Sequence, residues 1–274
     1  MAAAENEMDG FVRLEARAPL KISGADAESF LQNIVTQDVA GLREGELRYG
    51  CLLTPQGRFL HDFFIFRDGA DFILEGEAAR MDDLIRRLKM FRLRAKVDIG
   101  AADFAVYAGA EIPKADFSFA DPRLPEMGFR SYLPVAATGA AGAPDAYKDR
   151  RIRLGVPEGG VEIKPEIDTI SDVSLDRLGA VSWRKGCFVG QEVTARMKNR
   201  GLAKKRLAIV AGRGLVAGAA LVQAGVAVGE VRAVNAAGGA GLAVLRLAAA
   251  EAADGSPIMQ SGGGIVTVHF PISP

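Results

Sequence analysis

The segment Trp183–Arg196 reads WRKGCFVGQEVTAR and carries the densest polar and glycine signal in the chain. Gly186 and Gly190 flank Cys187, and glycines on both sides of a cysteine let the backbone come close to a ligand. The cation of Lys185 and the start of a helix just after the cysteine would each favour the thiolate. The segment therefore predicts either a reactive cysteine or a buried cysteine in a glycine-rich turn, since reactivity depends on exposure.

The first hundred residues predict a mixed α/β unit, because the hydrophobic period alternates between two and about 3.6 residues. The expected elements are a strand over Phe11–Glu15, a helix that starts after Ser23–Asp26, a meander over Tyr49–Leu53, Phe59–Phe66 and Phe72–Glu75, a helix over Met81–Phe91 and a strand over Leu93–Ile99. This order is a ferredoxin-like pattern with one additional strand.

The sequence pattern changes after the first hundred residues and changes again at Arg206. We expect a second sheet to open at Phe104–Tyr107, a small-residue loop over Thr138–Pro144, and a short helix over Ala146–Leu154 that Gly155 stops. From Arg206 onward, short apolar runs alternate with glycine turns, which is typical of a small β-barrel. The predicted domains are 1–102 (first α/β subdomain), 103–204 (second α/β subdomain) and 205–274 (barrel).

Composition limits the functional classes. The chain of 274 residues has 34 Lys and Arg against 34 Asp and Glu, whereas nucleic-acid coats and membrane-surface proteins carry a basic excess. Its two cysteines and two histidines are too few for a self-contained zinc site or a four-cysteine cluster, so no metal ligands are predicted. No signal peptide or membrane span is visible, and we expect a cytoplasmic protein that is a monomer.

The central segment contains the string KGCFVGQE, which resembles the signature K-G-C-[YF]-x-G-Q-E of the YgfZ family. Ile22–Gln32 is similar to the first helix of that family, Leu53–Arg58 to its first hairpin, and Arg200–Arg206 to the junction with its barrel. These proteins are folate-binding relatives of the glycine-cleavage T-protein and include a factor that helps to mature [4Fe–4S] proteins.

The resemblance implies an α+β, three-subdomain aminomethyltransferase-like fold, with two ferredoxin-like subdomains around a central channel and a C-terminal β-barrel. It implies a tetrahydrofolate-binding accessory protein that supports assembly or repair of iron–sulfur clusters in client enzymes, including tRNA-modifying ones. Its partners would be folate, iron–sulfur assembly proteins and client [4Fe–4S] enzymes. The alternative is a folate-dependent aminomethyltransferase; whether the chain catalyses a reaction is left open.

The same resemblance assigns roles to the signature residues. Cys187 would face the ligand space as the key group. The residues expected to bind the folate or a one-carbon derivative are Lys185, Gly186, Gly190, Gln191, Glu192 and Arg196. Lys185 and Arg196 would meet folate carboxylates, and Glu192 would accept hydrogen bonds from pterin amino groups. The alternatives are a carboxylate that stabilises its own helix and a solvated cation.

One further pair follows from comparison with the T-protein, where an acidic residue on the matching strand assists aminomethyl transfer. This chain has His61-Asp62 where the T-protein resembles a pair of aspartates. Asp62 is the candidate catalytic acid and His61 a candidate proton shuttle. The favoured alternative is that both are polar residues on the outer face of a strand.

A basic cluster follows the signature, made of Arg196, Lys198, Arg200, Lys204, Lys205 and Arg206, with no acid among them. Such a cluster could bind RNA or an acidic partner, form a solvated rim, or attract a polyanionic folate. We expect no direct RNA binding and no membrane contact.

Overall fold

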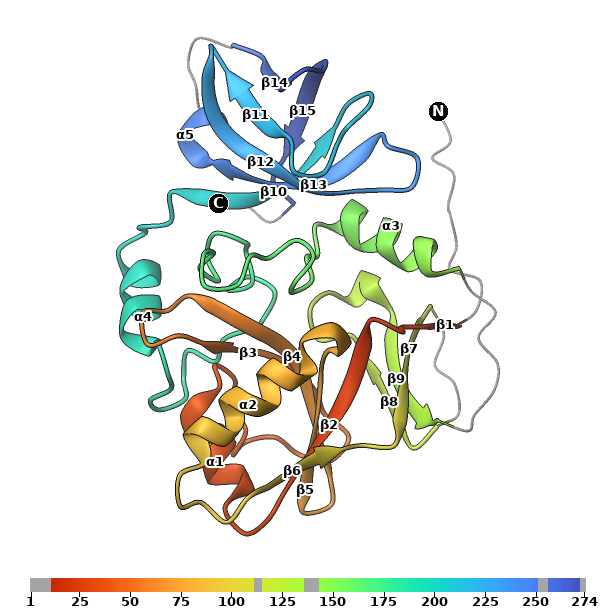
Figure 1. The fold of residues 1–274 in the computed structure, drawn as a ribbon, viewed down its shortest axis with the longest axis vertical. Coiled ribbons are helices and arrows are strands. Elements are labelled where there is room, and N and C mark those ends of the chain that lie inside the picture. Colours follow the sequence, from red (N-terminus) through yellow and green to blue (C-terminus); the bar gives the residue numbers. More distant parts are fainter. Residues whose placement is uncertain (1–10, 111–114, 136–142, 251–255, 272–274) are drawn as a thin grey trace. The chain divides into compact units, whose positions relative to one another are not determined.

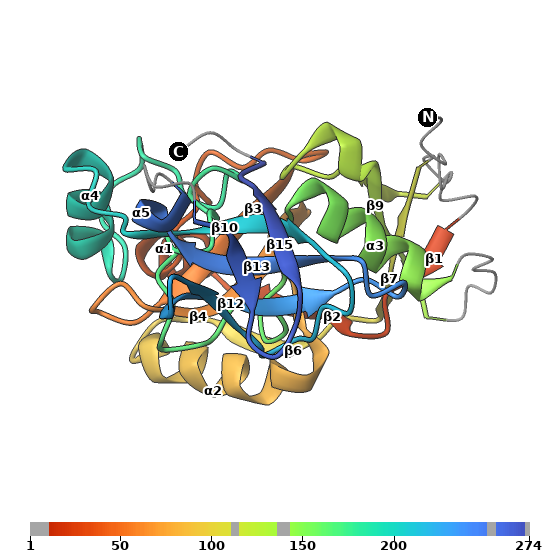
Figure 2. The ribbon, with the colours of Figure 1, turned by 90° about the horizontal axis from the view of Figure 1, so that it is seen from above.

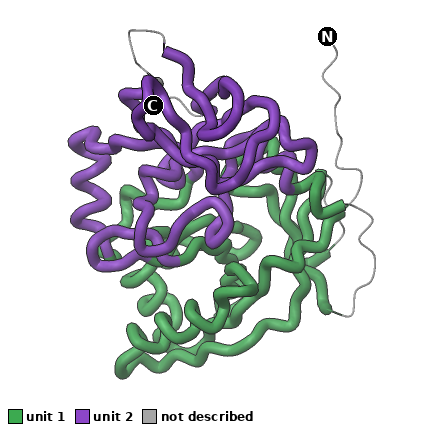
Figure 3. Tube along the Cα trace, turned by 45° about the horizontal axis from the view of Figure 1, so that its top comes forward, with its two compact units in different colours: residues 1–52, 61–147, 179–189 green, residues 53–60, 148–178, 190–274 purple. Residues whose placement is uncertain are grey.

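The computed structural model describes residues 11–110, 115–135, 143–250 and 256–271 (Figure 1). The chain divides into two compact units that interleave along the sequence (Figure 3). Unit 1 comprises residues 1–52, 61–147 and 179–189, and unit 2 comprises residues 53–60, 148–178 and 190–274. The division into three subdomains at residues 102 and 204 stays a prediction.

Unit 1 contains a five-stranded sheet in the order β3-β4-β5-β2-β6. Its strands are β2 (Arg17–Ser23), β3 (Leu47–Leu53), β4 (Phe59–Asp68), β5 (Asp71–Glu77) and β6 (Asp98–Ala101). The helices α1 (Ala27–Ile34) and α2 (Met81–Arg92) both contact β5, and a 3-10 turn, η1 (Ala78–Arg80), leads into α2. The predicted meander and second helix are confirmed.

Two predicted strands of this region are present but differ from the prediction, one in its sheet and one in its start. Phe11–Arg13 forms β1, which pairs with the second sheet, and the strand before α1 is β2. The alternation over 93–99 does not form a strand until Asp98, because Leu93 has φ 46° and is 84% exposed. The backbone turns there, with Ala95 N–H donating to the Arg92 carbonyl at 2.8 Å.

The second sheet of unit 1 has four strands in the order β1-β7-β9-β8. They are β1 (Phe11–Arg13), β7 (Phe104–Gly109), β8 (Phe117–Ala120) and β9 (Phe129–Pro134), with a 3-10 turn, η2 (Pro125–Met127), before β9. The prediction that a strand of a second sheet begins at Phe104 is confirmed by β7. Residues 138–142 of the predicted small-residue loop lie outside the described residues.

Helix α3 (Pro144–Leu154) confirms the predicted basic helix, and it stops at Gly155, which has φ 71°. The chain then passes through turns whose apolar side chains are buried, among them Ile163, Ile170 and Leu175. Helix α4 (Gln191–Asn199) begins at Gln191, within the signature, as predicted.

The C-terminal strands close into a six-stranded barrel in the order β10-β13-β12-β11-β14-β15, with β10 pairing to β15 (Figure 2). They are β10 (Lys205–Ala211), β11 (Ala220–Gln223), β12 (Val226–Val234), β13 (Ala240–Arg246), β14 (Ile258–Gln260) and β15 (Ile265–His269), with helix α5 (Leu247–Ala250) after β13. The predicted barrel is confirmed, although β11 and β14 were not expected. Small aliphatic side chains fill it, including Ala208, Leu221, Val231 and Leu245.

Candidate functional site

The first half of the signature is a loop in unit 1 that exposes its cysteine. Cys187 is exposed, whereas the next residue, Phe188, is buried. Lys185 lies over the Phe188 ring, with Nζ 5.5 Å from the ring centroid. The expectation of an accessible thiol therefore fits the structure better than the alternative of a buried cysteine.

Lys185 fixes this loop to the end of α1. Its ammonium donates to the carbonyls of Gln32, Val35 and Gln37 at 2.6, 2.6 and 2.9 Å. Burial lowers the pKa of Lys185 to about 8, and the charge of Asp38 opposes this shift. All three N–H donors have acceptors in the protein, so this arrangement makes Lys185 a positioning group for Cys187.

The second half of the signature belongs to unit 2 and starts at Gly190, where a side chain would not fit. Gly190 has φ 82°, and a Cβ there would lie 2.5 Å from the Thr54 carbonyl oxygen and 3.1 Å from Cα of Gly57. Thr194 Oγ1 donates to the Gly190 carbonyl at 2.9 Å. The glycine is thus required by the close approach of α4 to the β3–β4 turn.

The polar residues of α4 differ in exposure. The side chains of Glu192 and Arg196 are exposed and have no hydrogen-bond or ion-pair partner among the described residues, while Gln191 is half-buried. Gly186, in the unit 1 half, is exposed and has open space around the position of a Cβ. The spacing of four residues puts Glu192 and Arg196 on one side of the helix, so a carboxylate and a guanidinium are both available there.

The pair His61 and Asp62 corrects an expectation. Neither lies on an outer face of β4: His61 is 3% exposed and Asp62 is 2% exposed. Successive strand residues point to opposite faces, so the two side chains have different surroundings. His61 Nε2 lies 2.9 Å from Asp83 Oδ2 on α2, whereas Asp62 Oδ2 accepts from the Tyr49 hydroxyl at 3.0 Å. A direct proton relay from His61 to Asp62 is therefore not supported.

His61 is held neutral by its surroundings. Burial lowers its pKa to about 4, and the nearby Arg80 adds to this effect, while the hydrogen bond to Asp83 opposes it. Because the Asp83 carboxylate only accepts, His61 donates through Nε2.

Asp62 belongs to a buried ionic network in unit 1 that the sequence did not indicate. Glu75 is the centre of this network: it accepts from Arg17 Nε at 2.7 Å, from Arg130 Nε at 2.6 Å and from the Tyr132 hydroxyl at 2.8 Å. Arg17 also lies 3.6 Å from Asp62. Three guanidinium groups face three carboxylates in this interior, which are Arg17, Arg123, Arg130, Asp62, Glu75 and Asp121.

The guanidinium groups and carboxylates of the network neutralise one another's charges. Burial opposes the ionisation of Glu75, but Arg130 and Arg17 outweigh it and lower the pKa of that carboxyl to about 2. Arg130 also stacks over the Phe64 ring, with Cζ 3.9 Å from the centroid. The one weak signal for it in the sequence is a lone charge inside an apolar strand, as at Glu75 after Phe72-Ile-Leu74.

Two classes of feature are absent from the described part of the chain. Among the residues with described positions, no group of three or more His, Cys, Asp or Glu side chains is arranged to hold a metal ion. No helix within those same ranges is long and apolar enough to cross a membrane.

The chain resembles known proteins in two regions. Residues 10–105 match the family model of the GCVT N-terminal domain. Residues 204–272 match the model of the CAF17 C-terminal β-barrel domain.

Among curated proteins, two fungal relatives carry the same name, "Iron-sulfur cluster assembly factor IBA57 homolog, mitochondrial". The one from Pyricularia oryzae is 35% identical over 219 residues, which cover 72% of this chain and 56% of that protein. The one from Chaetomium globosum is 32% identical over 240 residues, covering 72% and 55%. The chain thus spans about half the length of these relatives. The expectation of a cytoplasmic protein is wrong by this comparison, because the matched relatives are mitochondrial proteins.

The fold has a solved counterpart. The crystal structure of glycine cleavage system aminomethyltransferase T from Bartonella henselae matches with a TM-score of 0.77 and 19% sequence identity, covering 95% of this chain and 85% of that one. The predicted aminomethyltransferase-like fold is confirmed. The chain therefore joins a GCVT-type N-terminal region to a CAF17-type β-barrel within an aminomethyltransferase-like fold.

Proposed function

We propose that this protein is a tetrahydrofolate-binding accessory factor that supports the assembly or repair of iron–sulfur clusters in client enzymes, tRNA-modifying ones among them. Two things support the proposal: the likeness to relatives named as iron–sulfur cluster assembly factors, and the YgfZ-type string at Lys185–Glu192. Iron–sulfur assembly proteins and client [4Fe–4S] enzymes would be its partners.

The observation that carries the proposal is the exposed thiol of Cys187. It stands on a loop whose base is fixed by three hydrogen bonds from Lys185. A thiolate is the protein ligand that iron–sulfur clusters use, and one exposed cysteine cannot complete a cluster site alone. Under this proposal, Cys187 acts together with groups that a partner protein supplies.

The chemistry of the available side chains fits a folate. The exposed Glu192 carboxylate can accept from the amino groups of a pterin, and the exposed Arg196 guanidinium can pair with a folate carboxylate. The Lys185 donors are already taken by carbonyls, so we assign that residue to positioning. A bound tetrahydrofolate would supply a one-carbon carrier next to these residues.

Aminomethyl transfer is the second candidate function, and the observation that favours it is the similarity in fold to an aminomethyltransferase. It would depend on Asp62 as the acid. Asp62 is buried and already paired with Tyr49 and Arg17, which makes it a weaker candidate than the exposed thiol. An assay for aminomethyl transfer to tetrahydrofolate, on wild type and Asp62→Asn, tests this alternative separately.

The central experiment measures the activity of a [4Fe–4S] enzyme, such as an aconitase, in cells that lack the gene. Wild type and the matched control Cys51→Ala should restore the activity, whereas Cys187→Ala should not. All three proteins must accumulate to equal levels. Full rescue by Cys187→Ala would show that the function does not need the thiol. Unchanged activity of [4Fe–4S] enzymes in the deletion strain would overturn the assembly role.

A second experiment tests the folate by titrating purified protein with tetrahydrofolate. We expect Glu192→Gln and Arg196→Gln each to weaken binding about tenfold, because each removes a charge-assisted hydrogen bond. Arg200→Gln, an exposed cation just beyond α4, is the control and should bind as wild type does. Equal affinity for tetrahydrofolate in all variants would show that the α4 side chains Glu192 and Arg196 do not bind it.

A further inference from the structure

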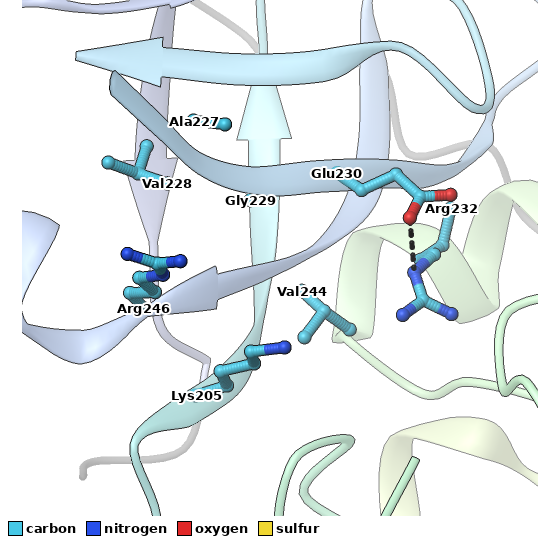
Figure 4. Close-up of a pocket in the computed structure, with 8 residues that line it drawn as sticks. All are labelled: Lys205, Ala227, Val228, Gly229, Glu230, Arg232, Val244 and Arg246. Atoms are coloured by element: carbon cyan, nitrogen blue, oxygen red, sulfur yellow. Dashed lines mark ion pairs between the residues drawn. The ribbon is translucent and has the colours of Figure 1, made fainter. Parts of the chain in front are cut away.

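The outer surface of the barrel in unit 2 carries a pocket of about 210 Å³ (Figure 4). Strands β10, β12 and β13 supply its walls, and three of its side chains are cationic. The lining residues that carry charge are Lys205, Glu230, Arg232 and Arg246. The pocket is small and polar, so its occupant must be a small polar species.

Two of these cations occupy paired positions on neighbouring strands. Lys205 on β10 and Arg246 on β13 are directly opposed in the antiparallel register, so their side chains project from the same face. Both are exposed, and neither has a hydrogen bond or ion pair within the described ranges. Like charges placed directly opposite each other destabilise a strand pair, so this arrangement costs stability unless an anion binds there.

The acid of the pocket does not compensate them. Both oxygens of Glu230 accept from Lys164 Nζ, at 2.6 and 2.8 Å. Figure 4 shows Glu230 and Arg232 together on one side of the pocket, joined by their ion pair, and Lys205 and Arg246 apart from them. Lys205 and Arg246 therefore supply positive charge that no carboxylate of the pocket neutralises.

Arg232 is the third cation of the pocket, and it is already paired. Its two Nη atoms each lie 3.0 Å from an Asp168 oxygen, and its side chain is 7% exposed. Its Nε is buried and has no hydrogen-bond partner; the Glu230 carboxylate is 3.8 Å away. Arg232 is therefore held by Asp168 and Glu230, and its guanidinium forms part of the pocket wall.

We propose that this pocket binds a small oxyanion, through phosphate or carboxylate groups that meet Lys205 and Arg246. A guanidinium and an ammonium on opposed strands suit oxygens that carry a full negative charge. The ligand is either a free anion or the acidic end of a larger molecule, such as the glutamyl tail of a folate.

The test is a calorimetric titration of the full chain with inorganic phosphate at low ionic strength. We expect one site per chain, weakened by added chloride because screening reduces charge–charge attraction. The double variant Lys205→Gln/Arg246→Gln should lose at least about tenfold in affinity. The control Lys204→Gln/Arg213→Gln removes two exposed cations that do not line the pocket and should bind as wild type does.

Folding of the variants is checked by thermal unfolding, and removing one or both like charges should leave the Tm equal or higher. Equal phosphate affinity in wild type and the pocket variant would overturn the proposal, as would the absence of binding in the wild type.

Comparing tetrahydrofolate with its triglutamate form distinguishes the two sources of the anion. A tail that occupies the pocket predicts tighter binding of the triglutamate form, with the advantage lost in Lys205→Gln/Arg246→Gln. Equal affinity for both folates, together with phosphate binding that needs Lys205 and Arg246, identifies a free anion. The phosphate result does not depend on the proposed folate function, so failure of one leaves the other measurable.

Discussion

The interior of unit 1 contains a buried ionic network, whereas the core of the barrel in unit 2 is aliphatic. In unit 1, Glu75, Arg17 and Arg130 are fully or nearly fully buried and are joined by hydrogen bonds of 2.6 to 2.7 Å. In the barrel, the core consists of aliphatic side chains such as Ala208, Val231 and Leu245. Both sets of side chains are buried, but only the first requires every partner to be in place.

The difference shows two ways to specify a fold. An aliphatic core is non-directional and tolerates rearrangement if volume is kept. A buried ionic network is stable only when each charge has its partner, since the cost of desolvating an ion exceeds most single interactions. The barrel should therefore lose stability gradually under mutation, and unit 1 abruptly.

The largest expected effect is that of Glu75→Gln. It removes the charge that compensates Arg17 and Arg130, and loss of one buried partner costs about 3 to 5 kcal/mol. Urea unfolding followed by hydrogen exchange should locate this loss in β4 and β5. The exposed control Glu44→Gln should change the free energy of unfolding by less than about 0.5 kcal/mol. A small effect of Glu75→Gln would mean that the network adds little to stability.

Next comes Leu221→Ala in the barrel, where Leu221 is completely buried. Deleting a buried leucine side chain costs about 2 to 5 kcal/mol, through lost burial and a cavity. The lost protection against exchange should be confined to the barrel strands. Val226→Ala, at an exposed barrel position, is the control. If protection falls equally in β4 and β5, the two units unfold together and the contrast between their interiors is not visible in stability.

A smaller effect is expected from pH. The folded-state pKa of His61 is about 4, below the ordinary value of 6.5, so the unfolded chain binds the proton first as the pH falls. Stability of unit 1 should be constant above pH 6.5 and decrease by about 1 to 2 kcal/mol towards pH 5. His61→Gln should remove this slope, whereas His269→Gln, on the barrel, should keep it. An unchanged slope in His61→Gln would assign it to other groups.

The smallest effect on stability is expected for substitution of the exposed cysteine, Cys187; the other cysteine, Cys51, is buried. Burial raises the pKa of the Cys51 thiol well above its ordinary value, and the charge of Asp62 adds to this. Cys187 is exposed, so a thiol reagent should label one cysteine rapidly in the native protein. Cys187→Ala should abolish that fast phase with stability unchanged. Rapid labelling in Cys187→Ala would indicate that the unit 1 interior opens readily.

The local elements were predicted where a single period dominates. The meander of β3, β4 and β5, helix α2 and four of the six barrel strands follow from alternation, helical spacing and glycine turns. The failures are at short or ambiguous segments. Phe11–Arg13 alternates like a strand of either sheet, and only pairing with β7 decides between them. The run from Leu93 alternates without forming a strand, because Leu93 has a positive φ and the chain makes a turn there.

The sequence by itself predicted the class of fold, the signature loop and the two candidates on α4, Glu192 and Arg196, because short-range patterns and a contiguous motif carry that information. Only the tertiary structure decided that Lys185 positions the loop, that Asp62 is buried, and that Lys205 lies opposite Arg246. These facts depend on contacts between residues far apart in the chain. The sequence around an isolated charged residue is the same whether its side chain is solvated or paired in the interior. Only the burial of that side chain in the structure distinguishes the two cases.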